Sequence, residues 1–114
     1  MADDGLGDLE VDLDRFASAH ATGAVVLDVR NPDEYEAGHV PGATLIPLPQ
    51  LGARQDEIPE GDPIYVICAS GGRSLTATRA MVQAGYRAVS VAGGTRGWNE
   101  QGHPFDLGTE ETAG

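Results

Sequence analysis

The chain has 114 residues and a mass of 11.9 kDa, enough for one folded domain and too little for a second hydrophobic core. Seven basic residues, all of them arginine, stand against eighteen acidic ones, so the formal net charge is −11. This charge disfavours non-specific binding to nucleic acid and docking on anionic membranes. The one cysteine, Cys68, excludes an internal disulfide and a cysteine-rich metal site.

Acidic residues are concentrated at the two ends of the chain. Residues 1–14 contain six acids and no base, and residues 105–114 contain three acids and no base. We expect 1–8 and 106–114 to be flexible, solvated segments around a domain that spans 9–105. The first residues lack the apolar segment of a secretory signal, and no apolar run is long enough to cross a bilayer, which predicts a cytoplasmic protein.

In the first half of the chain, short apolar segments alternate with helical signals. The predicted elements, in chain order, are a strand at 9–11, a helix at 13–20, a strand at 24–29, a helix from Pro32 to about Gly38 and a strand at 43–46. Asp12 and Asn31 precede the two helices, and their side chains are of the kind that caps free backbone N–H groups. The run 24–29 is apolar except at Asp28, which is typical of a strand buried on both faces.

The second half of the chain continues this alternation. The predicted elements are a helical turn at 51–57, a strand at 64–67, a helix at 74–84, a strand at 89–92 and a helix that ends near Gln101. Thr95 is expected to cap the last helix. Much of the apolar surface of the 74–84 helix is expected to come from Leu75, Thr78, Ala80, Met81 and Val82. The alternation predicts an α/β sandwich with a largely parallel sheet.

The clearest chemical signal follows the strand at 64–67. Cys68 ends that strand, a turn of small residues with two glycines comes next, and Arg73 precedes the next helix. Ligands of open α/β sheets bind beyond the carboxyl ends of the strands, and a glycine-rich turn can direct its N–H groups inward to stabilise negative charge. The segment therefore predicts a nucleophilic Cys68 thiolate, an oxyanion held by Arg73, and hydroxyl donors at Ser70 and Ser74. The alternative is that Cys68 is an inert, buried apolar residue.

Three separate segments carry a resemblance to a known family. They are LDVRNPDEYEAGHVPGA at 27–43, CASGGRS at 68–74 and GGTRGWNEQGHP at 93–104. Together, and in this order, they resemble the signatures of single-domain rhodaneses, the thiosulfate sulfurtransferase-like domains. The resemblance covers residues 9 to about 105. It implies a three-layer α/β sandwich in which a five-stranded, mostly parallel sheet has helices on both faces.

The resemblance also implies a sulfurtransferase that needs no cofactor. Cys68 would attack the outer sulfur of a donor such as thiosulfate, release sulfite, and carry the sulfur as a persulfide to a thiophilic acceptor. The backbone N–H groups of the loop would cradle the terminal sulfur, and Arg73 would help to hold the donor. The active-site loop implied in this way consists of Ala69, Ser70, Gly71, Gly72, Arg73 and Ser74. The implied partners are a small anionic sulfur donor and a thiol or protein that donates or accepts sulfur, with the domain expected to be a monomer.

Asp28 and Arg30 lie at the carboxyl end of a predicted strand, on the same side of the sheet as Cys68. They could shape the electrostatics of the site. We favour a structural role, because ion-paired charges near a sheet edge usually belong to the scaffold. In this interpretation Arg30 pairs with an acid such as Glu34, and Asp28 accepts hydrogen bonds from the loop.

The remaining histidines and the one tryptophan are predicted to be structural. His39 is expected to stabilise a turn rather than to act as a base for Cys68. Trp98 is expected to anchor packing. His20 and His103 are isolated in the sequence and lack the spacing of metal ligands.

Two other function classes stay open at this stage. Many rhodanese-like domains relay sulfur to a protein partner or only bind one, and an intact Cys68 does not separate relay from free-standing catalysis. Cysteine phosphatases and arsenate reductases also use a Cys-to-Arg loop, but with one residue more than the four between Cys68 and Arg73. Ile67 stands where phosphatases usually carry histidine. The shorter loop suits a sulfur atom better than a phosphate group.

Overall fold

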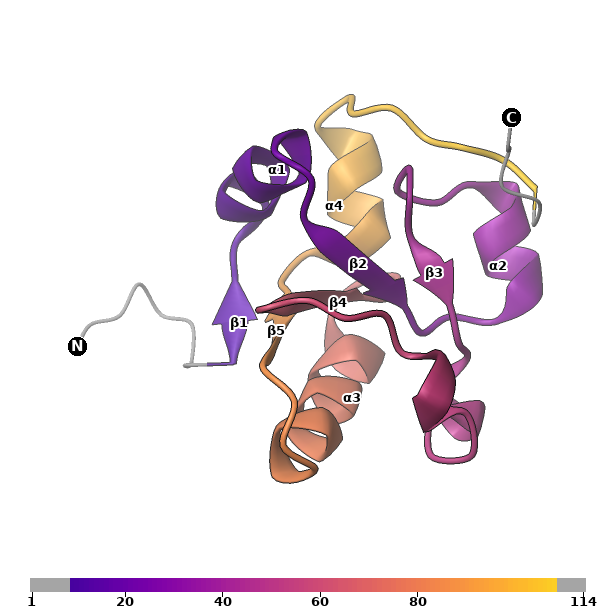
Figure 1. Cartoon of the computed structure of the whole chain (residues 1–114). Helices are drawn as coiled ribbons and strands as arrows, with labels where there is room; N and C mark the ends of the chain where they lie inside the picture. Colours follow the sequence, from indigo (N-terminus) through magenta and orange to yellow (C-terminus); the bar gives the residue numbers. More distant parts are fainter. Residues whose placement is uncertain (1–8, 109–114) are drawn as a thin grey trace.

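The centre of the molecule is a five-stranded sheet in which every pair of neighbouring strands is parallel (Figure 1). The computed structural model describes residues 9–108; the ends 1–8 and 109–114, which we expected to be flexible, lie outside the described residues. The strands are β1 (Glu10–Val11), β2 (Val25–Asp28), β3 (Thr44–Leu45), β4 (Ile64–Ile67) and β5 (Ala88–Val91). Their spatial order is β1-β5-β4-β2-β3, which places the most apolar strand, β4, in the middle. The predicted α/β fold class is confirmed.

Helices cover both faces of this sheet. They are α1 (Leu13–Ala21), α2 (Pro32–Ala37), α3 (Gly72–Gln83) and α4 (Gly94–Glu100), with two 3-10 turns, η1 (Leu48–Gln50) and η2 (Gln55–Glu57). On one face α1, α2 and α4 bury a cluster that contains Phe16 and Trp98, whose ring centroids are 5.3 Å apart. On the other face α3 and the 3-10 turns bury a second cluster around Met81. Because side chains alternate along a strand, β4 contributes Val66 to the second cluster and Ile67 to the first.

Several predicted element boundaries are corrected by the backbone. Strand β4 lies where it was predicted. Of the helical turn expected over 51–57, only 55–57 is helical, as the 3-10 turn η2, and a further 3-10 turn, η1, precedes the predicted range. Helix α3 starts at Gly72, two residues before its predicted start, because Gly71 adopts a positive φ of 121° and turns the chain there. Arg73 consequently lies in the first turn of α3 rather than before it, and Ser74 lies in that turn as predicted.

The surfaces of α3 and α4 also differ from expectation. In α3 the buried side chains are Ser74, Ala77, Thr78 and Met81, while Ala80 and Val82 are exposed. Thr95 does not cap α4. That position belongs to Gly93, whose φ of 88° is in the left-handed region, and Thr95 is buried inside the first turn.

A buried ion pair joins the end of β2 to the segment before α2. Asp28 is fully buried and Arg30 is 5% exposed. The carboxylate of Asp28 accepts hydrogen bonds from Nε of Arg30 at 3.0 Å, from NH2 at 2.9 Å and from the Arg30 backbone N–H at 3.0 Å. Arg30 also donates to the carbonyl of Gly38 at 2.9 Å. The predicted Arg30–Glu34 pair is therefore wrong: two residues apart in an extended segment, Asp28 and Arg30 point to the same face.

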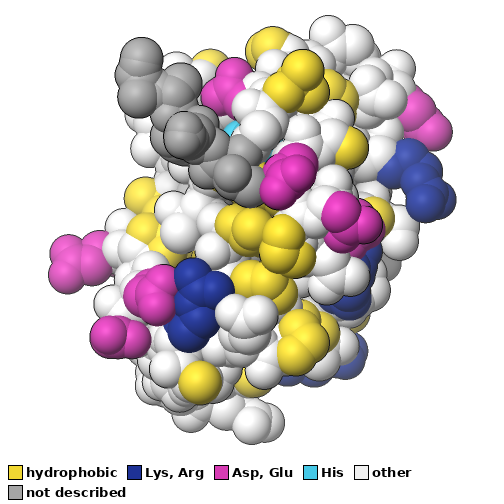
Figure 2. Space-filling view, turned by 90° about the vertical axis from the view of Figure 1, so that its right-hand side faces the viewer, with side chains coloured by type: hydrophobic (Ala, Val, Ile, Leu, Met, Phe, Trp, Pro, Cys, Tyr) yellow, Lys and Arg dark blue, Asp and Glu magenta, His cyan; other side chains and the backbone are white. Residues whose placement is uncertain are grey.

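On the face drawn in Figure 2, apolar side chains lie between acidic and basic ones. Among residues 9–108, no helix is long and apolar enough to cross a membrane. Of the segment 106–114, Asp106 exchanges two backbone hydrogen bonds with His39, and Gly108 donates one to the Glu36 carbonyl.

Substitution of Asp28 by Asn tests the structural role of the buried pair. The change leaves the Arg30 guanidinium buried without a counter-charge, so the free energy of unfolding should fall by about 3–5 kcal/mol. Urea unfolding followed by circular dichroism measures this fall. The matched control is Asp62→Asn, which breaks the Asp62–Arg87 pair, whose side chains are 69% and 72% exposed. That control should leave stability almost unchanged, and equal effects of the two variants would contradict the assignment.

Candidate active site

The Cys68 loop lies at the carboxyl edge of the sheet, between the end of β4 and the start of α3. The Cys68 residue is only 1% exposed. Two backbone hydrogen bonds fasten this loop to the start of α4: the Thr95 N–H donates to the Cys68 carbonyl at 2.8 Å, and the Arg96 N–H donates to the Ala69 carbonyl at 2.9 Å. The Cys68 and Ala69 carbonyls are thereby directed toward α4, while the Gly71 N–H faces the sulfur.

The sulfur of Cys68 makes hydrogen bonds to two groups of its own loop. The Gly71 N–H donates to Sγ at 3.1 Å, and the Cys68 thiol donates to the Ser74 hydroxyl oxygen at 3.4 Å. Burial raises the pKa of the Cys68 thiol, but the Ser74 hydroxyl and the backbone N–H groups of Ser74, Gly71 and Ser70 lower it by more. The net pKa lies below the ordinary value, as expected for a sulfur placed among inward-facing amides at a helix start.

A second serine, which the sequence analysis missed, supports the first. Ser90 on β5 is fully buried, and its hydroxyl lies 2.7 Å from the hydroxyl of Ser74. Ser74 also donates to the Gly71 carbonyl at 3.2 Å. When Cys68 ionises, Ser74 can turn its proton toward Sγ while Ser90 donates to the Ser74 oxygen. In the sequence, a polar residue between Val89 and Val91, in an otherwise apolar strand, was the signal that could have indicated the role of Ser90.

Arg73 does not project freely over the loop, because a carboxylate holds it. Its NH1 and NH2 groups donate to the two oxygens of Glu34 at 2.8 and 2.9 Å. Hydrogen bonds from Arg73 lower the pKa of Glu34 to about 2, with the Asn31 N–H contributing in the same direction. Glu34 in turn raises the pKa of Arg73. The pair links the start of α2 to the start of α3 across 39 residues of chain and fixes the guanidinium at the rim of the loop.

The other predicted residues lie away from Sγ or have structural partners. His39 donates from Nδ1 to the Tyr35 carbonyl at 2.8 Å and stacks on the Tyr35 ring, as expected of a residue that stabilises a turn. Trp98 is 2% exposed and its indole N–H donates to the Pro104 carbonyl at 2.7 Å, so its predicted packing role is confirmed. His20 and His103 both contact the Trp98 ring. Within residues 9–108 no three histidine, cysteine or acidic side chains gather in a way that could hold a metal ion.

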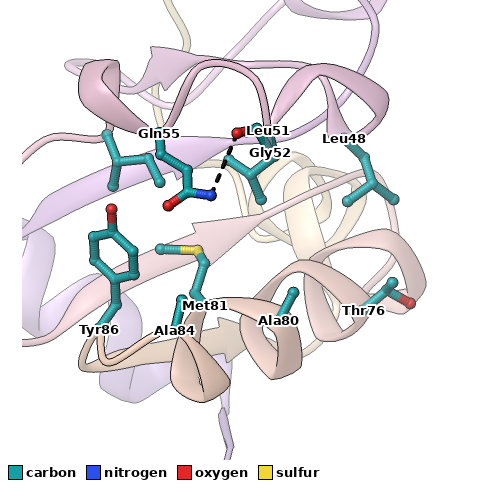
Figure 3. A pocket seen from close by; sticks show the side chains of 10 residues that line it. Leu48, Leu51, Gly52, Gln55, Thr76, Ala80, Met81, Ala84 and Tyr86 are labelled. Carbon is teal, nitrogen blue, oxygen red and sulfur yellow. Dashed lines mark hydrogen bonds between the residues drawn. The ribbon is translucent and has the colours of Figure 1, made fainter.

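Two hollows in the surface differ in how they relate to the Cys68 loop. One has a volume of about 420 Å³ and is bordered by Ser70 of the Cys68 loop and by Gly93, Arg96 and Glu100 of the α4 region. The other, about 140 Å³, lies between α3 and the 3-10 turns; Leu48, Leu51, Met81 and Tyr86 line it, and it contains no charged side chain (Figure 3). Only the first of them includes a residue of the Cys68 loop.

Substitution of Ser74 by Ala tests the hydroxyl contribution to the sulfur. The loss of one hydrogen bond to a thiolate should raise the pKa of Cys68 and slow its alkylation at neutral pH by about tenfold. Thiolate absorbance during a pH titration measures the pKa, and intact mass measures the alkylation rate. Ser18→Ala, on the exposed side of α1, serves as the control and should change neither. An unchanged titration in the Ser74 variant would leave only the amides as the cause of the lowered pKa.

Comparison with known proteins gives matches over most of the domain. The sequence profile of the family described as "Rhodanese-like domain" matches residues 12–101. "Putative sulfur carrier protein YrkF" of Bacillus subtilis (strain 168) is 46% identical over 74 residues, which are 64% of this chain and 40% of YrkF. "Thiosulfate sulfurtransferase 18" of Arabidopsis thaliana is 34% identical over 118 residues, covering 90% of this chain and 85% of that protein.

Solved structures agree with the sequence matches. The crystal structure of a rhodanese-related protein from Thermoplasma volcanium superposes with a TM-score of 0.79 at 31% identity, covering 86% of this chain and 97% of that one. The chain spans less than half of the length of YrkF, so the similarity to YrkF concerns one part of that protein.

Proposed function

The chain belongs to the rhodanese-like domain family, and from that membership we propose that it is a sulfurtransferase which carries sulfane sulfur as a persulfide on Cys68. The observation that supports this most directly is the position of Sγ among the Gly71 N–H and the Ser74 hydroxyl, with a lowered pKa. Relatives named for sulfur transfer and for sulfur carriage agree with this proposal. No cofactor enters the scheme.

The first half-reaction takes sulfur from a small anionic donor such as thiosulfate. The Cys68 thiolate attacks the outer sulfur of the donor, and an Sγ–S bond forms. The S–S bond of thiosulfate breaks, and sulfite leaves with its electron pair. The negative charge then resides on the outer sulfur of the persulfide, where the inward-facing N–H groups of the loop stabilise it.

The second half-reaction gives this sulfur to a thiophilic acceptor, cyanide in an assay or a thiol in the cell. The acceptor attacks the outer sulfur, the Sγ–S bond breaks, and the thiolate of Cys68 is restored. A single cysteine suffices because the sulfur enters and leaves at the same atom. Arg73 contributes a fixed positive charge at the rim, but two of its donor groups are already held by Glu34. The amides of the loop therefore provide the main stabilisation of negative charge.

A second candidate is sulfur relay between proteins. It is favoured by the match to YrkF, which is named as a sulfur carrier and is much longer than this chain. In that case a protein such as a cysteine desulfurase supplies the sulfur, and thiosulfate is a poor donor. The loop chemistry at Cys68 is the same in both cases, so the two functions are distinguished by the donor from which Cys68 takes sulfur.

Intact-mass spectrometry after incubation with thiosulfate tests the proposal. The native chain should gain the mass of one sulfur atom, and cyanide should remove it as thiocyanate. Cys68→Ala should gain nothing, while Ser18→Ala should behave like the native chain. Gain from a cysteine desulfurase but none from thiosulfate would favour relay, and no gain from either donor would contradict sulfur transfer through Cys68.

The rate of persulfide formation should depend on pH with a definite sign. Only the thiolate attacks, so the rate should rise with pH through the pKa of Cys68 and level off above it. Because that pKa is lowered, the rise should come at a lower pH than for a free cysteine thiol. Initial rates by intact mass over a pH series measure this. If the rate rises only at or above the pH at which the Cys68 thiol titrates in the unfolded chain, the loop does not activate the sulfur.

A further inference from the structure

The arginines at the carboxyl edge of the sheet differ in whether a carboxylate already holds them. Arg30 is paired with Asp28, and Arg73 is paired with Glu34. Arg96, in the first turn of α4, is exposed, and its side chain makes no hydrogen bond or ion pair with any of residues 9–108. Its backbone N–H donates to the Ala69 carbonyl, so Arg96 is adjacent to the Cys68 loop. Near this loop, it is the arginine whose guanidinium is available to a ligand.

Arg96 borders the 420 Å³ hollow together with Ser70 and Glu100. This volume lies within the range of about 300–1,000 Å³ that is usual for small-molecule sites. Arg96 and Glu100 are one helical turn apart, yet no ion pair joins them among the contacts of the described residues. Arginine four residues before glutamate is the less favourable order for such a pair. A positively charged and a negatively charged residue therefore both line the hollow beside the Cys68 loop.

This charge pattern selects among possible sulfur substrates. A small dianion such as thiosulfate would be attracted by Arg96 and repelled by Glu100. A molecule with a carboxylate and an ammonium group would satisfy both. We propose that this hollow is the subsite for a small zwitterionic thiol of the α-amino-acid type, which accepts sulfur from Cys68 with its carboxylate on Arg96 and its ammonium group on Glu100.

The inference rests on the proposed function, because it requires a persulfide on Cys68. The acceptor thiolate attacks the outer sulfur of that persulfide. The bond between the acceptor sulfur and the outer sulfur forms as the Sγ–S bond breaks, and the electron pair returns to Sγ. The proton lost by the acceptor thiol goes to the outer sulfur, which was anionic in the persulfide, and no oxidant or reductant is consumed.

The apolar groove between α3 and the 3-10 turns offers no comparable site. None of its lining residues belongs to the Cys68 loop, and none is charged. In Figure 3, Gln55 donates to the Gly52 carbonyl, so its amide is partly engaged within the wall. A charged thiol would lose hydration there without gaining a partner.

A single-turnover comparison of four thiols tests the subsite. Cys68 is loaded with sulfur from thiosulfate, or from polysulfide as a second reagent, and the excess reagent is removed. Loss of the extra sulfur is then followed by intact mass with cysteine, cysteamine, 3-mercaptopropionate and 2-mercaptoethanol. These carry both charged groups, the ammonium only, the carboxylate only and neither. Each variant is compared with the native chain for the same thiol, so that differences in intrinsic thiol reactivity cancel.

Arg96→Ala should slow transfer to cysteine and to 3-mercaptopropionate by about tenfold at low thiol concentration, because one charge-assisted hydrogen bond to the carboxylate is lost. Glu100→Gln should slow transfer to cysteine and to cysteamine. The loss should appear in the concentration needed for half-maximal rate rather than in the maximal rate, and 2-mercaptoethanol should be unaffected. Arg79→Ala on α3 and Glu36→Gln on α2, both exposed and outside the hollow, are the matched controls. Native rates in both test variants, or equal losses for all four thiols, would overturn the inference.

A binding measurement keeps this test separate from the sulfur chemistry. Serine, which carries a hydroxyl in place of the thiol of cysteine, is titrated into the native chain and into Arg96→Ala, and amide NMR shifts are recorded. Shifts at Ser70, Gly93 and Gly97 in the native chain alone support the subsite, and their absence from the native chain overturns it. A chain that binds serine but takes up no sulfur from any reagent would contradict the proposed function and not the subsite.

Discussion

The close approach of the start of α4 to the Cys68 loop is the contact on which the geometry of the site depends. The Thr95 and Arg96 N–H groups donate to the carbonyls of Cys68 and Ala69. Gly94, the residue before Thr95, lies directly against these two carbonyls. A Cβ at Gly94 would lie 2.5 Å from the Cys68 carbonyl oxygen, closer than real Cβ atoms approach. Only glycine permits this distance. Since the loop carbonyls are bound on that side, the loop amides face inward, and the electrostatics of the sulfur follow from a backbone contact.

The distribution of charge explains how a strongly acidic protein can stabilise a thiolate. Arg30 and Arg73 near the site each have a carboxylate partner, so their fields are largely cancelled. The groups that lower the pKa of Cys68 are instead neutral backbone N–H groups and the Ser74 hydroxyl. Such dipoles are fixed by the fold and add no net charge. Stabilisation of the thiolate is therefore compatible with a net charge of −11.

The sequence predicted the elements well where the signal was local. Strand β4 follows from a run of apolar residues, and the cap at Asp12 follows from a side chain beside the backbone N–H that it binds. The start of α3 was missed because Gly71 and Gly72 resemble a loop until the φ of Gly71 is known. Thr95 was misassigned because a threonine after two glycines resembles a cap, whereas Gly93 occupies that position.

The candidate site was predictable only in part, for the same reason. Cys68 and its loop form one continuous segment, which sequence motifs describe well. The Glu34–Arg73 pair spans 39 residues, and the Ser74–Ser90 contact joins a helix to a neighbouring strand. Such partners are chosen by the packing of the sheet and helices, which no spacing in the sequence reveals. The pairing of Arg30 with Asp28 instead of Glu34 illustrates the point, since both acids were within reach along the chain.

The position of Trp98 gives the molecule a built-in optical reporter. It is the only tryptophan of the chain and lies on α4, the helix whose first turn holds the Cys68 loop. Its indole ring packs against Phe16, His20 and His103. All of the indole fluorescence therefore originates from one environment, which exists only while α4 is docked on α1. Changes in the emission of this single fluorophore will register displacement of the helix that shapes the sulfur site, without any added label.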